Sequence, residues 1–275
     1  MGAVPTERST REMSAKELTR RALLALGLNV HWIRRSMRPD PKRLPDHDLY
    51  APVFEPWRAP GEFKEIYENV KPLALAGPDR AHVLYSLARQ ALVVDGEFWE
   101  CGVYRGGTAL LLAEMLRRNA GSVPRPLRLF DTFTGMPEVD PRRDLHHGSD
   151  FADTSVESLR ARFSSYEFAS IHAGLIPASF EGLEHSRIAF AHADVDLYRS
   201  TMDSCAFIYP RLVPGGFLVF DDYGFASCPG ARQAVDDFFQ EKPEIPLVLS
   251  TGQAVVFRAP QAAKREPSGG REERT

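Results

Sequence analysis

The sequence predicts an α/β fold built on a mostly parallel β-sheet, and three observations carry this prediction. From residue 96 onward, short apolar segments typical of strands alternate with segments typical of helices. Short apolar strands linked by helices are typical of a parallel sheet covered on both faces. Near the end of the chain, two strand segments flank a Thr251-Gly252 turn, which predicts an antiparallel C-terminal hairpin at one edge.

The elements follow one another in strand–helix order along this part of the chain. Each expected strand is a run such as "EFWECG" or "RIAFAHADV", and each expected helix a longer run such as "GTALLLAEMLRRN". The third strand is followed only by a brief segment, "IPASFEGL". The expected strands are 97–102, 126–131, 169–174, 187–195, 216–222, 246–250 and 253–259, and the expected helices are 107–119, 154–166, 200–212 and 230–241.

The N-terminal part of the chain is expected to form a helical extension. Helical segments at 15–28 and 77–93 are separated by a proline-rich link from Pro39 to Pro60. Arginines at 20, 21, 34 and 35 flank the apolar run 22–33, which would suit a membrane surface. We expect the helix 15–28 instead to pack on the domain or on a second subunit, in a symmetric homodimer or a higher homo-oligomer. The predicted organisation is a disordered tail over 1–14, a helical lid or dimerisation region over 15–90, an α/β domain over 91–260 and a disordered tail over 261–275.

Composition excludes several classes of function. The chain has 275 residues, 43% of them hydrophobic, and a net charge of −3, which argues against general nucleic-acid binding. No segment reaches the roughly 18 apolar residues of a membrane span, and the first twenty residues lack the apolar core of a signal peptide. Three cysteines show neither metal-ligand spacing nor a disulfide framework, so we expect reduced thiols in the cytoplasm.

Carboxylates gather where the predicted strands end. In an open parallel sheet, ligands bind outside the carboxyl ends of the strands, so these acids are expected on one rim. Acids are costly to gather unless a positive charge lies among them. The rim therefore predicts a ligand site, and its six acids are Glu100, Asp131, Asp194, Asp196, Asp221 and Asp222.

The turn "ECGVYRGGT" between the first strand and the first helix is a candidate cofactor loop. Glycines at 102, 106 and 107 allow close approach of the backbone to a ligand, although a plain strand–helix turn is the alternative. The spacing differs from the dinucleotide pattern G-x-G-x-x-G, which disfavours a nicotinamide oxidoreductase. Glu100 suits a ligand that carries a positive charge. Asp131, ending the second strand, is expected to bind ribose hydroxyls, with a turn cap as the alternative.

The later acids predict a metal site. Asp194 and Asp196 point the same way if the strand stays extended, and Asp221 and Asp222 can reach one ion only if their strand breaks. Oxygen ligands favour Mg²⁺ over Zn²⁺, and helix capping is the alternative. His192 is expected to be a partly buried histidine with a backbone partner. His146 and His147 lie in a polar loop, either against substrate or in solvent.

Together, "ECGVYRGGT", "LFDTFTGMPE", "DFADTS", "HADVDLYRST" and "GGFLVFDDYG…CPGARQAVDDF" resemble the macrocin O-methyltransferase family over residues 80–258. These bacterial enzymes use S-adenosylmethionine and Mg²⁺ to methylate sugar hydroxyls of antibiotics. The resemblance implies a Rossmann-like class I methyltransferase sheet with an N-terminal helical extension, acting on a hydroxyl of a small, glycosylated acceptor. A catechol-type methyltransferase and a non-catalytic binding protein on the same fold remain the alternatives.

The resemblance also implies roles for individual residues. Asp196 corresponds to the general base, and three aspartates correspond to Mg²⁺ ligands: Asp194, Asp221 and Asp222. The cofactor would be held by the glycine turn, by the acid at the end of the second strand and by the "DFADTS" segment. The implied cofactor-binding residues are Glu100, Gly102, Tyr104, Gly106, Thr108, Asp131, Thr132, Asp153, Ser155 and Asp194.

Overall fold

The structure is a computed structural model that describes residues 19, 22–23, 55–119, 121, 124–148 and 150–259. It divides into two compact units, 1–54 and 55–275. In the first unit, Thr19, Ala22 and Leu23 are helical, in agreement with a helix over 15–28. The two expected disordered tails and the rest of that helix lie outside the described residues.

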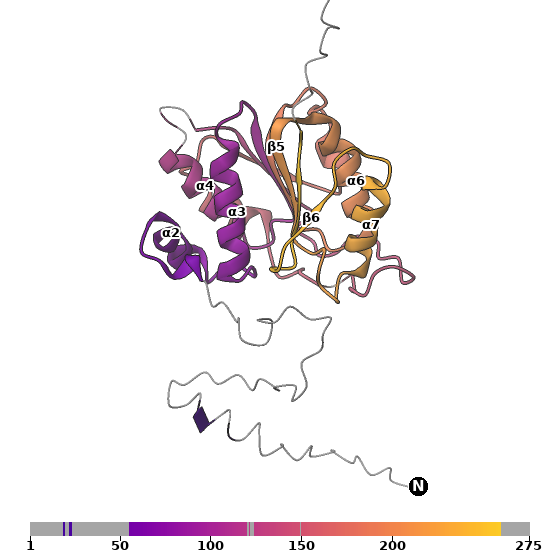
Figure 1. The fold of residues 1–275 in the computed structure, drawn as a ribbon, viewed down its shortest axis with the longest axis horizontal. Coiled ribbons are helices and arrows are strands. Elements are labelled where there is room, and N and C mark those ends of the chain that lie inside the picture. Colours follow the sequence, from indigo (N-terminus) through magenta and orange to yellow (C-terminus); the bar gives the residue numbers. More distant parts are fainter. Residues whose placement is uncertain are drawn as a thin grey trace, which may run out of the picture. The chain divides into compact units, whose positions relative to one another are not determined.

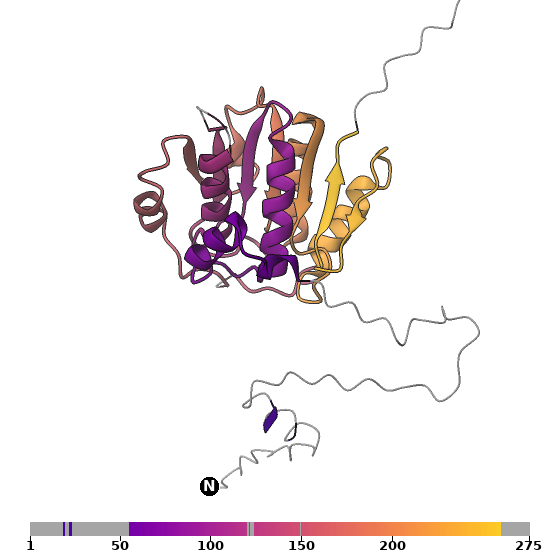
Figure 2. The same ribbon diagram turned by 60° about the vertical axis from the view of Figure 1, so that its left-hand side comes forward.

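A seven-stranded sheet forms the centre of the second unit (Figure 1). The strand order is β3-β2-β1-β4-β5-β7-β6, and every neighbouring pair from β3 to β5 is parallel. β7 pairs antiparallel with both β5 and β6, and this C-terminal hairpin lies at one edge of the sheet (Figure 2). The mostly parallel sheet with a C-terminal hairpin is therefore confirmed. The strands are β1 (Glu97–Cys101), β2 (Leu127–Asp131), β3 (Ala169–Ala173), β4 (Ile188–Ala193), β5 (Leu212–Phe220), β6 (Leu247–Val248) and β7 (Ala254–Phe257).

Helices cover both faces of the sheet. Successive strand residues point to opposite faces, so a strand can pack against helices on both sides. Phe98 packs in the core on the face of α2 to α5, and its neighbour Trp99 packs in the core on the face of α6 and α7. Among the described residues, no helix is long and apolar enough to cross a membrane. The helices are α2 (Glu62–Val70), α3 (Pro78–Ala91), α4 (Gly107–Asn119), α5 (Val156–Arg162), α6 (Tyr198–Ile208) and α7 (Pro229–Phe239).

Two helices differ from the sequence prediction. α2 was not predicted, although its apolar residues Phe63, Ile66 and Val70 have helical spacing and are buried. The expected helix 154–166 is only α5, which Ser155 caps by accepting a hydrogen bond from Ser158 N. The compact unit begins at Glu55, so α2 and α3 belong to the unit that contains the sheet.

The sheet topology positions the site. The chain leaves β1 toward β2 on one side, and β4 lies on the other side of β1. Ligands bind at such a reversal, outside the carboxyl ends of the strands. The segments that follow β1, β2, β4 and β5 therefore meet at one edge of the sheet.

Candidate active site

A single cavity of about 280 Å³ lies at this edge, close to the lower end of the range for small-molecule sites. It is also lined by the segment Leu73–Ala76, which joins α2 to α3, and by Arg80 of α3. Both the expected cofactor loop and the expected metal ligands contribute to its wall. The predicted site residues that line it are Gly102, Tyr104, Thr108, Asp131, Thr132, Asp194, Asp196 and Asp222.

Gly102 is required where β1 ends. Its φ is +83°, in the left-handed region, and a Cβ atom there would lie 1.7 Å from the carbonyl oxygen of Asp194. At Gly107, a Cβ atom would lie 2.3 Å from the backbone of Ala74. These two glycines let the end of β4 and the α2–α3 segment approach the loop closely. The loop is thus a packed wall of the cavity and more than a plain strand–helix turn.

Asp131 is held rigidly by the backbone of this loop. Its Oδ2 accepts hydrogen bonds from the N–H groups of Val103 and Tyr104, at 2.7 and 2.8 Å, and its Oδ1 accepts one from Phe133 N at 2.7 Å. The bond from Phe133 is the turn cap that the sequence offered as the alternative to ribose binding. A carboxylate offers about four acceptor positions, so one remains for a ligand hydroxyl. Capping and ligand binding are therefore compatible roles for Asp131.

The acids after β4 and β5 come together, but not by the route that the sequence predicted. The strand does not stay extended, because β4 ends at Ala193 and Asp196 has a φ of +57°. This tight turn lets the N–H of Asp196 donate to Asp222 Oδ2 at 3.0 Å. Carboxylate oxygens of Asp194, Asp196 and Asp222 lie within 4.8 Å of one another. A non-glycine residue in this strained conformation is typical of a functional site.

The electrostatics of this cluster favour a bound cation. Burial raises the pKa of Asp194 and of Asp222 well above the usual range, and neighbouring carboxylates raise it further. Burial also raises the pKa of Asp196. Buried acids stay ionised when they are paired or when they coordinate a metal. The all-oxygen donor set of Asp194 and Asp222 fits Mg²⁺.

Asp221 has a different environment from its neighbour Asp222. Its Oδ2 accepts a hydrogen bond from Arg80, and its Oδ1 accepts one from Gln253 Nε2 at 2.8 Å. Nε2 of His192 lies 3.5 Å from Oδ1. Burial opposes ionisation, but His192, Arg80 and Gln253 together hold the pKa of Asp221 below its usual value. The chain itself therefore neutralises Asp221, which does not line the cavity.

Glu100 and His192 form a buried pair inside the sheet. His192 Nδ1 lies 2.9 Å from Glu100 Oε1, and both side chains are fully buried. The prediction of a backbone partner for His192 was therefore wrong, because its position in β4 aligns it with Glu100 of β1. Burial opposes charging of His192, yet the carboxylates of Asp221 and Glu100 raise its pKa well above the usual value. Glu100 does not line the cavity, and its Oε2 has no hydrogen-bond partner among the described residues.

Four predicted cofactor residues lie outside the main cavity: Glu100, described above, and Gly106, Asp153 and Ser155. Asp153 and Ser155 line a second, smaller cavity on the other side of Tyr104. The carboxylate of Asp153 accepts a hydrogen bond from Tyr104 Oη at 2.7 Å and pairs with Arg105. Gly106 lines neither cavity, and a Cβ atom there would lie 2.6 Å from Leu159 of α5.

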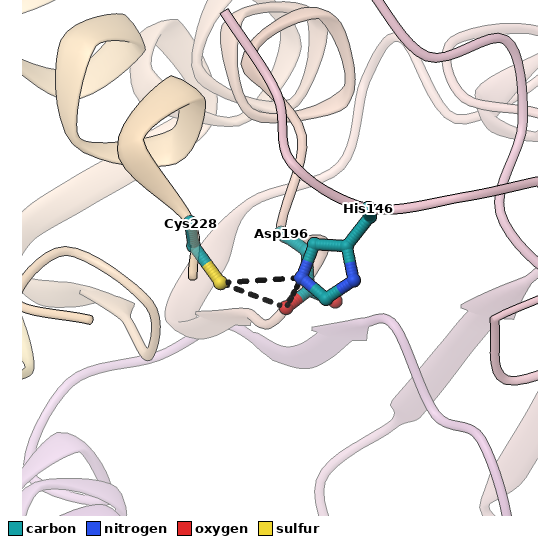
Figure 3. Close-up of side chains that lie close together, drawn as sticks. All are labelled: His146, Asp196 and Cys228. Carbon is teal, nitrogen blue, oxygen red and sulfur yellow. Dashed lines mark hydrogen bonds and ion pairs between the residues drawn. The ribbon is translucent and has the colours of Figure 1, made fainter. Parts of the chain in front are cut away.

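The structure also brings in residues that sequence reasoning did not single out. Arg80 and Gln253 reach Asp221 from positions 141 and 32 residues away along the chain. Cys228 lies beside Asp196, together with His146, and Figure 3 shows the three side chains. Of the two loop histidines that the sequence singled out, His146 lines the cavity and His147 is exposed. No local motif indicates these contacts, because they depend on how distant segments pack.

Solved O-methyltransferases share this fold. The structure matches the O-methyltransferase NovP with a TM-score of 0.59 at 23% identity, over 68% of this chain and 83% of that one. It matches CalS11, a calicheamicin methyltransferase, with a TM-score of 0.58 at 21% identity, over 94% and 98% of the two chains. The fold is therefore that of the class I O-methyltransferases, as the sequence predicts.

Curated relatives are methyltransferases of antibiotic pathways. The 8-demethyl-8-(2,3-dimethoxy-alpha-L-rhamnosyl)-tetracenomycin-C 4'-O-methyltransferase of Streptomyces olivaceus is 35% identical over 156 residues, covering 53% of this chain and 58% of that protein. The mycinamicin III 3''-O-methyltransferase of Micromonospora griseorubida is 31% identical over 158 residues, 53% of this chain and 61% of that protein. The alignments thus span somewhat more than half the length of each relative.

The macrocin O-methyltransferase family model matches residues 73–258. This match includes the glycine turn after β1, the acids after β4 and β5, and the C-terminal hairpin. It begins in the segment that joins α2 to α3 and so includes the Leu73–Ala76 wall of the cavity. The chain belongs to the macrocin O-methyltransferase family.

Proposed function

We propose that the chain transfers a methyl group from S-adenosylmethionine to a hydroxyl oxygen of a small molecule, with Mg²⁺ as a second cofactor. One observation carries this proposal. The wall of one cavity contains the glycine turn after β1 and Asp131, and it also contains the carboxylates of Asp194, Asp196 and Asp222. A methyl donor and a hydroxyl acceptor that share this cavity would meet next to the acids.

The first half of the cavity suits the methyl donor. Asp131 is fixed by three backbone N–H groups and retains an acceptor position for a ribose hydroxyl. Gly102 and Gly107 bring the backbone close on either side of the loop. S-adenosylmethionine supplies an electrophilic methyl group on a positively charged sulfur. Fixing donor and acceptor in line is the main contribution that such a rigid wall makes to the rate.

The second half suits a hydroxyl acceptor held at a metal. Asp194 and Asp222 would hold Mg²⁺, since burial and neighbouring carboxylates raise the pKa of both. His192 and Arg80 offset this only in part at Asp194. Asp221 could join them by exchanging a contact with Arg80 or Gln253. A bound divalent cation lowers the pKa of a hydroxyl that it coordinates. Asp196 would accept the proton as the general base, and burial raises its pKa, which makes its carboxylate a stronger base.

The acceptor is proposed to be a sugar hydroxyl. The relatives named above include one that acts on a rhamnosyl group and one that acts at a 3''-hydroxyl position. A solved neighbour is described as a TDP-rhamnose 3'-O-methyltransferase. Sugar hydroxyls are much weaker acids than phenols, which ionise near pH 10, so a sugar acceptor depends more on the base Asp196. The presence of Asp196 in the cavity wall therefore favours a sugar over a catechol, which would use the same cofactor and metal.

The proposal is tested first through ligand binding. S-adenosylhomocysteine at 100 times its Kd should stabilise the full chain by about 2.7 kcal/mol, measured as a rise in melting temperature. NAD should have no effect. Stabilisation by NAD without any response to S-adenosylhomocysteine would exclude a methyltransferase.

The second test is a search for the acceptor. The chain, S-adenosylmethionine and Mg²⁺ are incubated with nucleotide-linked deoxysugars, with glycosylated aromatic and macrolide compounds, and with catechols. Mass spectrometry then detects the gain of one methyl group. Methylation of catechols alone would replace the sugar by a phenol as the proposed acceptor.

We further propose that the chain works as a homodimer in the cytoplasm. The support is the apolar segment 15–28, which is too hydrophobic to remain in solvent on its own. Light scattering of the full chain should give twice the mass of the monomer. Deletion of residues 1–36 should reduce that mass or the stability, and a monomer unaffected by the deletion would contradict the proposal.

A further inference from the structure

Three metal-binding side chains from separate segments meet beside the acidic cluster (Figure 3). His146 comes from the loop between β2 and α5, Asp196 from the turn after β4, and Cys228 from the residue before α7. Cys228 Sγ lies 3.2 Å from Asp196 Oδ1 and 3.5 Å from His146 Nε2, and His146 Nε2 lies 3.5 Å from Asp196 Oδ1. One sulfur, one nitrogen and one oxygen atom therefore form a nearly equilateral triangle.

The triangle has the dimensions of one face of a tetrahedral metal site. Zn²⁺ binds cysteine sulfur at about 2.3 Å, histidine nitrogen at about 2.0–2.1 Å and carboxylate oxygen at about 2.0–2.2 Å. At tetrahedral angles, such ligands lie roughly 3.3–3.6 Å from one another. The observed separations of 3.2 to 3.5 Å need almost no adjustment. All three residues line the cavity, so the fourth position of such an ion would face it.

A second carboxylate orients the histidine for metal binding. His146 Nδ1 lies 3.0 Å from Asp150 Oδ2, and the same oxygen accepts the backbone N–H of His147 at 3.0 Å. The hydrogen bonds from His147 and His146 lower the pKa of Asp150, which keeps it ionised. A carboxylate on one ring nitrogen fixes the tautomer and leaves the other nitrogen, Nε2, free to bind a metal. This arrangement is independent of the triangle and indicates the same function.

We propose that His146, Asp196 and Cys228 bind a soft divalent transition-metal ion, with Zn²⁺ as the best match. The donor set distinguishes this site from the neighbouring cluster of Asp194, Asp196 and Asp222, which offers only oxygen. Thiolate and imidazole ligands favour Zn²⁺, whereas carboxylates alone favour Mg²⁺. The thiol of Cys228 donates to Asp196 in the metal-free chain, so metal binding replaces this proton.

Binding at this site would inhibit the proposed reaction. Asp196 Oδ1 is the atom that contacts both Cys228 and His146, and Asp196 is the proposed general base. An ion on that oxygen removes the acceptor for the hydroxyl proton. This consequence rests on the proposed function, whereas the metal site itself does not.

The test measures metal binding directly, on the full chain saturated with Mg²⁺ and S-adenosylhomocysteine. Co²⁺ is titrated as a spectroscopic substitute, and Zn²⁺ is titrated in competition with a chromophoric chelator. We expect one ion per chain and a thiolate-to-cobalt charge-transfer band. Cys228→Ser should abolish the band and weaken Zn²⁺ binding at least about 100-fold, and His146→Asn should weaken it similarly. Asp150→Asn should weaken it about 10–100-fold, as is typical for a partner of a metal-bound histidine.

Two control variants distinguish the loss of this site from a general effect of substituting a histidine or a cysteine. His147→Asn changes the neighbouring, exposed residue of the same loop, and Cys205→Ser removes a buried thiol elsewhere; both should bind Zn²⁺ with unchanged affinity. If Cys228→Ser unfolds, His146→Asn provides the same comparison from the loop. Absence of saturable binding, or unchanged affinity in both Cys228→Ser and His146→Asn, would overturn the site. Methyl transfer without Zn²⁺ binding would defeat only this inference, and Zn²⁺ binding without methyl transfer would defeat only the proposed function.

Discussion

The acids at the two edges of the sheet differ in their charge partners and in the direction of their pKa shifts. At the amino edge, Glu97 begins β1 and faces Arg128 at the start of β2. Arg128 Nε and Nη2 donate to the two oxygens of Glu97 at 2.6 and 2.8 Å, and Trp99 Nε1 donates at 2.9 Å. Burial opposes ionisation, but these donors lower the pKa of Glu97. The acid has a complete set of partners from the chain.

At the carboxyl edge, Asp221 has such partners, but its neighbours Asp194 and Asp222 are not neutralised to the same extent. Burial and neighbouring carboxylates raise the pKa values of Asp194 and Asp222, and His192 and Arg80 offset this only in part at Asp194. The difference shows which charges the fold stabilises by itself and which depend on a ligand. Paired acids such as Glu97 join strands, whereas unpaired acids at a ligand-binding edge are candidates for function.

The largest expected effect concerns Asp196, at the carboxyl edge. Asp196→Asn removes the proposed base and should lower turnover by about 10²–10⁴-fold, as is typical for general bases. Affinity for S-adenosylhomocysteine and Mg²⁺ should change little. The residual rate should rise with pH, because more of the acceptor ionises without help. Single-turnover methyl transfer measures this effect, and an unchanged rate would exclude Asp196 as the base.

The next largest effect separates the metal ligands from the base. Asp222→Asn or Asp194→Asn removes one carboxylate of the proposed Mg²⁺ site, so Mg²⁺ affinity should fall by about 10-fold or more. Activity should then recover in part at high Mg²⁺, whereas Asp196→Asn should show no such rescue. Isothermal titration of Mg²⁺ and the Mg²⁺ dependence of the rate provide the two readouts. Rescue of Asp196→Asn alone would mean that the two roles are exchanged.

The sequence predicts the fold more completely than the site. The strands and their mostly parallel pairing follow from apolar runs that alternate with helices, and the C-terminal hairpin follows from its Thr251-Gly252 turn. The order of the strands in the sheet comes from the structure. The acids that end the predicted strands also indicate the edge at which the cavity lies, because the carboxyl ends of parallel strands meet at one edge of the sheet. The turn at Asp196 was not predictable, because its left-handed backbone depends on the contact with Asp222. α2 has the right periodicity but lies next to a proline-rich link, which concealed it.

Contacts between residues far apart in the sequence limit how much of the site the sequence alone can predict. Whether an acid is neutralised depends on distant residues: Arg80 and Gln253 reach Asp221, while none of the described residues places a cation against Asp222. The adjacent pair in "FDDYG" looks equivalent in sequence and is not equivalent in space. The donor triangle of His146, Asp196 and Cys228 has no regular spacing either, so only the packing of three segments reveals it.

A smaller effect is expected in the stability of the metal-free protein. Because the pKa of Asp222 is raised on folding, the folded state holds a proton that the unfolded state has released. Stability in chelator should therefore fall as pH rises from about 4, the unfolded value, through the raised folded value. Asp222→Asn should be more stable than the parent at pH 8 by on the order of 1 kcal/mol. Thermal unfolding with and without Mg²⁺ checks this, and Mg²⁺ should remove the difference.

An effect of similar size belongs to the amino edge and has the opposite sign. Glu97→Gln removes the charge that pairs with Arg128, so the free energy of unfolding at pH 7 should fall by about 1–2 kcal/mol. The pKa of Glu97 is lowered on folding, so its contribution is present above about pH 4.3 and is lost as pH falls through the folded value. Urea unfolding should therefore show the parent and Glu97→Gln converging toward acidic pH. The exposed control Glu241→Gln should stay within about 0.5 kcal/mol of the parent. If Glu97→Gln matches the parent at pH 7, the pair does not stabilise the sheet, and the contrast between the two edges fails on the amino side.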